Sequence, residues 1–139
     1  VLITGLIFKS EAVKRTAFMI FIFGALASIV AMATGEGAEE MVEKIDGMSE
    51  NYIQSHEEMA ETFALLSYIL GGISLFGIWS SMKQKAVSFV VSTAVLIFAF
   101  IVLFYGKQTG TTGGAMRHTE IRDANNILAA QDKEATDED

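Results

Sequence analysis

The fold is decided by residues 55–105, which read SHEEMAETFALLSYILGGISLFGIWSSMKQKAVSFVVSTAVLIFAFIVLFY. A histidine among three glutamates opens onto an uncharged run, residues 62–82. A short basic turn follows, and then a second uncharged run, residues 86–106. Because about 20 apolar residues in a helix cross a bilayer, this stretch predicts two membrane spans joined by a tight hairpin.

Two further apolar blocks lie nearer the N-terminus. Residues 16–34 carry no charge and predict another membrane helix. Residues 1–8 amount to about half a span and lack the basic leader of a secretory signal, so we interpret them as the end of a first helix that begins upstream. The predicted fold class is an all-α integral membrane bundle with three full transmembrane helices and the end of a fourth. This domain covers residues 1–122, and residues 123–139 form an acidic tail that we expect to be flexible.

The composition excludes several classes of function. The 139 residues are 51% hydrophobic, carry a net charge of −7 and include no cysteine. Without cysteine there are no disulfides, thiolate metal sites or cysteine nucleophiles. No basic patch offers a surface for nucleic acid, and the acidic segments would repel a polyanion. The apolar runs described above instead predict the lipid bilayer as the first partner.

The acidic segment 36–61 holds nine carboxylates and one basic residue. Its apolar residues recur every three or four positions, which predicts an outer amphipathic helix lying along the membrane interface. Gly35-Glu36-Gly37 is predicted to break the preceding helix, and Gly47 to end the amphipathic one. Ser49 is the predicted N-cap of a helix that runs from Glu50 into the membrane.

The basic residues indicate an orientation. Segments 9–15 and 83–85 together carry five basic residues and one acid, whereas the opposite side carries sixteen acids and five basic residues. The positive-inside rule therefore places these two short loops in the cytoplasm. The 35–61 segment and the C-terminus are predicted to lie outside.

The two histidines of the chain, His56 and His118, both fall on this outer side. Glu57, Glu61 and Glu120 are close to them in sequence. Imidazole and carboxylate ligands suit a divalent metal, and two imidazoles from different segments can ligate a haem iron axially. The five residues are thus a candidate metal site, and the two histidines are candidate ligands of haem b. The alternative is a purely structural role. In that case His56 and the glutamates beside it cap and solvate a helix end, and His118 pairs with a glutamate to hold the tail.

Other features of the sequence predict no catalytic residue. The glycine-rich stretch 110–114 lacks the lysine and serine of a phosphate loop, so we interpret it as a flexible polar loop. Within the predicted spans the ionisable residues are Tyr68 and Tyr105, which gives little support to a proton or ion relay. Small residues at Gly24, Gly71 and Gly77 favour close packing between helices.

Three strings occur together in this chain: TGEGAEE at 34–40, HEE at 56–58 and GGAMRHTEI at 113–121. Over residues 1–122 the chain resembles an uncharacterised family of bacterial four-helix inner-membrane proteins, a domain of unknown function, in its Bacteroidetes-type version. The resemblance implies a bacterial inner-membrane location and specifies no activity. Family members begin with an Asn-His-Phe-Pro-like string that supplies a third outer histidine. That string is missing here, and so is the family's proline near the end of the second span.

The function predicted on these grounds is that of a small multi-pass inner-membrane protein, an accessory or structural subunit rather than an enzyme. Other membrane protein subunits, or further copies of the chain, are its expected protein partners. The alternative is a redox module that binds haem b or a metal through the outer-side histidines.

Overall fold

The structure is a computed structural model that describes residues 1–42, 50–83 and 85–117. These residues form helices and short turns without a β-strand. The all-α bundle predicted from the sequence is therefore confirmed. Its four helices are α1 (Leu2–Ile7), α2 (Glu11–Val42), α3 (Glu50–Lys83) and α4 (Lys85–Arg117).

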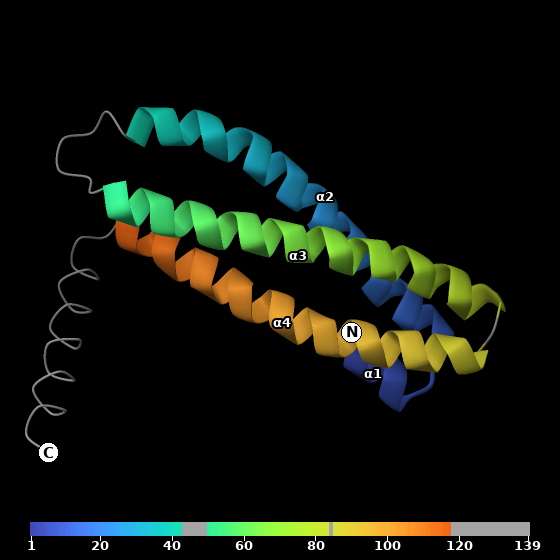
Figure 1. The fold of residues 1–139 in the computed structure, drawn as a ribbon. Coiled ribbons are helices and arrows are strands. Elements are labelled where there is room, and N and C mark those ends of the chain that lie inside the picture. Colours follow the sequence, from blue (N-terminus) through green and yellow to red (C-terminus); the bar gives the residue numbers. More distant parts are fainter. Residues whose placement is uncertain (43–49, 84, 118–139) are drawn as a thin grey trace, which may run out of the picture.

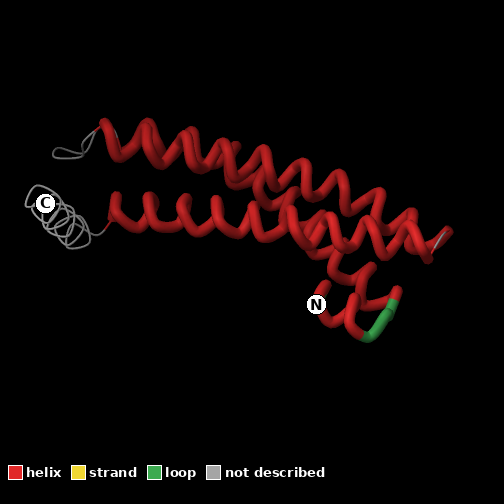
Figure 2. Tube along the Cα trace, turned by 60° about the horizontal axis from the view of Figure 1, so that its bottom comes forward, coloured by secondary structure: helices red, strands yellow, loops and turns green. Residues whose placement is uncertain are grey.

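The central helix is α3, which packs against α2 on one side and against α4 on the other (Figure 1). The short α1 lies against both α2 and α4, at the end of the bundle where α3 turns back into α4. A second view shows that the α1–α2 connection lies at this same end (Figure 2). The bundle thus has two different ends: the basic residues Lys9, Arg15 and Lys83 lie at one, and the glutamates that open α3 lie at the other.

Within the described residues, three helices are long and apolar enough to cross a membrane. They contain nearly all of the predicted spans, and the tight hairpin is confirmed because α3 ends at Lys83 and α4 begins at Lys85. Helices of this length and composition fit a small multi-pass membrane protein. The candidate spans are Glu11–Gly35, Ile53–Lys83 and Val87–Gly114.

The prediction for the start of the acidic segment is wrong. Gly35-Glu36-Gly37 does not break α2, which continues to Val42. The physical reason is that a glycine inside a helix costs only about 1 kcal/mol relative to alanine, which a long continuous helix tolerates. Residues 50–61 are the first turns of α3, which confirms the prediction of a helix that runs from Glu50 into the membrane. Gly47 and Ser49 lie outside the described residues, although α3 does begin at Glu50 as predicted.

The flexible loop predicted for residues 110–114 is also wrong, because α4 continues through it to Arg117. The hydroxyl groups of Thr109 and Thr111 donate to the carbonyl oxygens of Tyr105 and Lys107, one turn earlier, at 3.0 and 2.9 Å. These bonds satisfy the threonine hydroxyls inside the helix. The packing of α4 against α3 then outweighs the low helix propensity of the glycines.

The long helices approach closely where one of them carries a glycine. A Cβ added to Gly71 would lie 2.6 Å from the Cβ of Ala25 on α2, and one added to Gly77 would lie 2.8 Å from the ring of Phe18. The adjacent Gly72 faces away, and nothing lies within 4 Å of its Cβ position. Gly71 and Gly77 therefore act in helix packing as predicted.

Serine hydroxyls share the interior with apolar side chains. Ser80, Ser88 and Ser92 are as buried as Phe18. The Ser80 hydroxyl donates to the Gly77 carbonyl at 3.0 Å, and that of Ser92 to the Ser88 carbonyl at 2.6 Å. Such small polar residues allow helices to pack tightly in apolar surroundings while their hydroxyl groups stay hydrogen-bonded.

Large apolar side chains cover the outside of all three long helices. Trp79 is 56% exposed close to the hairpin, where an interfacial tryptophan is expected. Surfaces of this kind are unfavourable in water, so they are suited to contact with lipid. Examples are Phe23, Leu26 and Val30 on α2, Leu65 and Phe76 on α3, and Val90, Phe100 and Leu103 on α4.

Candidate functional site

His56, the first residue of the predicted site, lies half-buried between α3 and α4. Its Nδ1 atom is 3.0 Å from the Oγ1 atom of Thr112. The single hydroxyl proton of Thr112 is directed to carbonyl oxygens of its own helix, those of Gln108 at 3.2 Å and Thr109 at 3.0 Å. The contact joins α3 to α4, and which of the two atoms donates depends on the tautomer of the imidazole. The Nε2 atom has no hydrogen bond to any residue that the structure describes.

A glycine on α4 makes room for this imidazole ring. A Cβ added to Gly113 would lie 3.1 Å from the Cε1 atom of His56. One turn away, the Thr109 hydroxyl also donates to the carbonyl oxygen of Met59 on α3, at 3.0 Å. The N-terminal part of α3 and the C-terminal part of α4 are thus joined by two polar contacts at consecutive turns.

The other predicted ligands are not assembled with His56 in the described part of the chain. Glu57 and Glu61 follow it on α3 with exposed side chains. Among residues 1–42, 50–83 and 85–117, no group of three or more histidines and carboxylates is placed to hold a metal. His118 and Glu120 lie outside the described residues, so ligation by the two histidines together stays a prediction.

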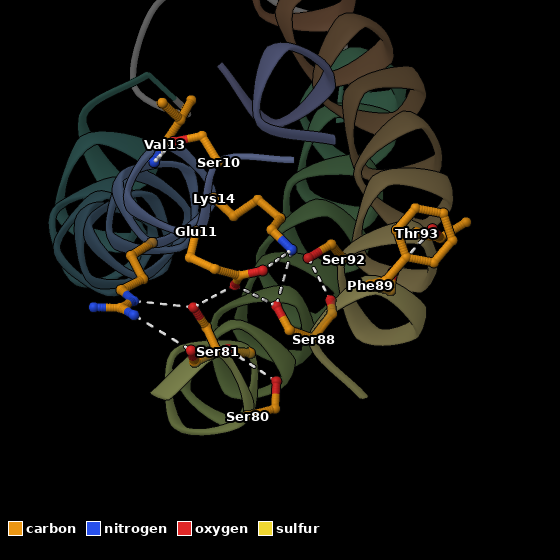
Figure 3. Close-up of polar contacts among 12 residues, drawn as sticks. Ser10, Glu11, Val13, Lys14, Ser80, Ser81, Ser88, Phe89, Ser92 and Thr93 are labelled. Carbon is orange, nitrogen blue, oxygen red and sulfur yellow. Dashed lines mark hydrogen bonds and ion pairs between the residues drawn. The ribbon is translucent and has the colours of Figure 1, made fainter. Parts of the chain in front are cut away.

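At the opposite end of the bundle, a polar cluster joins α2, α3 and α4 (Figure 3). The Nζ atom of Lys14 lies 2.7 Å from Oε1 of Glu11 and donates to the hydroxyl of Ser88 at 3.0 Å. The other oxygen of Glu11 accepts from Ser81 and from Ser88, both at 2.7 Å. Arg15 adds two bonds to Ser81, from Nε to the hydroxyl at 2.9 Å and from Nη2 to the carbonyl at 3.3 Å. We call these five residues the polar clamp.

The polar clamp was not predicted, because segment 9–15 was interpreted as a loop. In the structure α2 begins at Glu11, and Ser10 supplies a weak N-cap to the Val13 amide at 3.5 Å. The candidate span that begins at Glu11 therefore includes three charged residues that lie before the predicted span of residues 16–34, namely Glu11, Lys14 and Arg15. Glu11 and Lys14 are three residues apart, a spacing that places both side chains on one face of a helix. This spacing is the feature of the sequence from which their pairing could be predicted.

The short helix α1 covers the polar clamp. Lys14 is only 3% exposed, and a Cβ added to Gly5 would lie 2.8 Å from its Cγ atom. Lys9 has a positive φ of 52° and reverses the chain between α1 and α2. Both carboxylate oxygens of Glu11 and the Lys14 ammonium are engaged in bonds within the cluster. The clamp is therefore suited to holding helices together rather than to chemistry on a substrate.

A third feature is an open groove between α2 and α3 in the acidic half of the bundle. Its volume is about 400 Å³. Glu61 supplies one carboxylate to it, Thr62 and Tyr68 supply two hydroxyl groups, and the other lining side chains are apolar. The sequence alone does not predict this groove. The groove is lined by Met32, Glu61, Thr62, Ala64, Leu65 and Tyr68.

No protein-family model, curated protein or solved structure matches this chain.

Proposed function

We propose that this protein is a small accessory or structural subunit of a membrane protein complex, and that it is not an enzyme. The observation that carries the proposal is an open strip of small residues on α2. Gly24, Ala27, Ala31 and Gly35 are all exposed and, three or four apart, share one face of the helix. Nothing lies within 4 Å of a Cβ added to Gly24 or Gly35. A strip of this kind lets a further helix approach closely.

The neighbouring face of the same helix supports this reading. There Ala25 meets Gly71 of α3 at close range, so α2 already uses small residues to pack against one helix. The interior charges of the polar clamp are directed to other helices of the bundle as well. Contacts between helices thus account for Ala25 and for the charged residues of the polar clamp.

Site-specific photo-cross-linking in native membranes tests the proposal. A benzophenone side chain at Ala31 is expected to give a discrete higher-mass product, because this position lies at the open strip. The same group at Val90, an exposed position on α4, serves as the matched control. Adducts to lipid alone at Ala31, together with a monomeric protein after mild solubilisation, would refute the subunit role.

We further propose that the chain lies in a bacterial inner membrane with its basic end in the cytoplasm. Lys9, Arg15 and Lys83 support this orientation under the positive-inside rule. Membership of the uncharacterised family that the sequence resembles is part of the same proposal.

A second candidate function, a redox module with bound haem b or a metal, is favoured by the state of His56. The Nδ1 atom is hydrogen-bonded to Thr112 and Nε2 has no partner among the described residues. In the tautomer with the proton on Nδ1, Nε2 is free to bind a metal, and ligating histidines commonly hold their second nitrogen in this way. Visible spectra with and without dithionite, and metal analysis by mass spectrometry, test this candidate on the purified full chain. A haem or stoichiometric metal that is lost in His56→Ala supports it. The absence of both from the unmodified protein would remove it.

A further inference from the structure

The groove between α2 and α3 lies where the charged start of α3 gives way to its uncharged run. Glu61 is the last charged residue before the uncharged run of α3, and it lines the outer end of the groove. Tyr68 lies seven residues further along the helix, about 10 Å deeper at 1.5 Å per residue. A molecule that fills this groove must therefore be polar at one end and apolar at the other.

The polar end of the groove favours a cation. The Glu61 side chain is exposed and makes no ion pair within the described part of the chain. Glu57 and Glu58 are exposed one turn earlier on α3. Together these three carboxylates attract a positively charged group. A headgroup with a net negative charge would be repelled.

The groove also offers hydroxyl groups and an apolar floor. Thr62 and Tyr68 line it, and neither hydroxyl has a hydrogen bond to another described residue. They are available as donors to the phosphate and ester oxygens of a lipid. Met32 and Leu65 supply apolar surface on the two facing helices, on which an acyl chain could lie. The volume of about 400 Å³ falls within the range of small-molecule sites.

We propose that this groove binds one phospholipid with a primary ammonium headgroup, phosphatidylethanolamine. The ammonium group donates a charge-assisted hydrogen bond to Glu61, Thr62 donates to the phosphate, Tyr68 donates to an ester carbonyl oxygen deeper in the groove, and one acyl chain follows Leu65 toward the membrane interior. A choline headgroup carries the same charge but has no N–H donor. The site therefore distinguishes ethanolamine from choline by hydrogen bonding, and both from glycerol headgroups by charge.

Native mass spectrometry of the full chain, released from micelles that contain defined lipids, tests this proposal. Phosphatidylethanolamine, phosphatidylcholine and phosphatidylglycerol with identical acyl chains are compared at equal concentration. We expect one phosphatidylethanolamine to be retained about tenfold more than phosphatidylcholine. A factor of this size corresponds to one additional hydrogen bond to a charged group. Phosphatidylglycerol should be retained least.

Two variants assign the preference to the groove. Glu61→Gln removes the carboxylate charge and should abolish the preference for ethanolamine over choline, whereas Glu57→Gln, which lies outside the groove, should keep it. Tyr68→Phe should lower the retention of both lipids by a similar factor. Circular dichroism checks that each variant keeps its helices. Equal retention of ethanolamine and choline lipids by the unmodified chain, or an unchanged preference in Glu61→Gln, would overturn the proposal.

Discussion

At the scale of single residues, the charges of the polar clamp are the main electrostatic feature of the interior. Lys14 is buried, and its ammonium group depends on Glu11 and Ser88 for compensation. Removing one member of a buried pair leaves the other charge without a partner, which costs more than the pair itself contributes. The single substitutions should therefore be more harmful than a combined one.

Lys14→Met tests this expectation, because methionine keeps the length of the side chain and removes its charge. We expect the free energy of unfolding, measured by titration with sodium dodecyl sulfate in mixed micelles, to fall by about 3 kcal/mol. The double variant Glu11→Gln/Lys14→Met should recover part of this loss. Lys83→Met, at an exposed position, is the control and should stay within about 0.5 kcal/mol of the unmodified protein. Equal stability of Lys14→Met and the control would contradict the role of the clamp.

Two buried serines differ in their hydrogen bonds and should respond differently to removal of the hydroxyl. Ser88 bonds to both Lys14 and Glu11, so Ser88→Ala should lower the free energy of unfolding by about 1–2 kcal/mol. The Ser74 hydroxyl is buried without a partner among the described residues. Ser74→Ala should therefore be neutral or stabilising by up to about 1 kcal/mol. The same detergent titration measures both, and a larger loss in Ser74→Ala than in Ser88→Ala would contradict the assigned bonds.

At the scale of helices, two adjacent glycines allow the effect of close packing on stability to be measured separately from the effect of helix propensity. Gly71 has no room for a Cβ beside Ala25, whereas Gly72 faces open space. Gly71→Ala should lower the free energy of unfolding by about 1–3 kcal/mol through overpacking. Gly72→Ala should raise it by up to about 1 kcal/mol, since alanine is the better helix former. If both substitutions had the same effect, α2 and α3 would not be in contact at this point.

At the scale of the whole molecule, the difference between the two ends of the bundle predicts its orientation in the membrane. The chain has no cysteine, so single cysteines introduced at exposed positions can be labelled without background. Glu57→Cys should react with a membrane-impermeant maleimide in intact spheroplasts. Lys83→Cys should react only after lysis, because the positive-inside rule places it in the cytoplasm. The reverse pattern would invert the proposed topology and refute the orientation.

Much of this fold could be predicted from the sequence, since a run of about 20 uncharged residues is a local signal that needs no partner. Such runs predict the three long helices and the hairpin before Lys85. The close contact at Gly71 follows from a second local pattern, the presence of small residues within a span. The predicted interruptions at residues 35–37 and 110–114 are wrong because the helix-breaking effect of glycine is smaller there than expected, and the long helices continue. The propensity of one residue is a weak term beside the packing of a whole helix.

The candidate sites were less predictable than the fold. His56 was identified from its sequence neighbours, yet its described bond is to Thr112, 56 residues away. The polar clamp brings Glu11 to Ser81 and Ser88, which are 70 and 77 residues further along the chain. The sequence by itself determined that these helices are apolar, how long they are and which charges flank them. Which side chains meet was decided only by the tertiary structure, because the rotation of each helix about its axis depends on close packing with its neighbours.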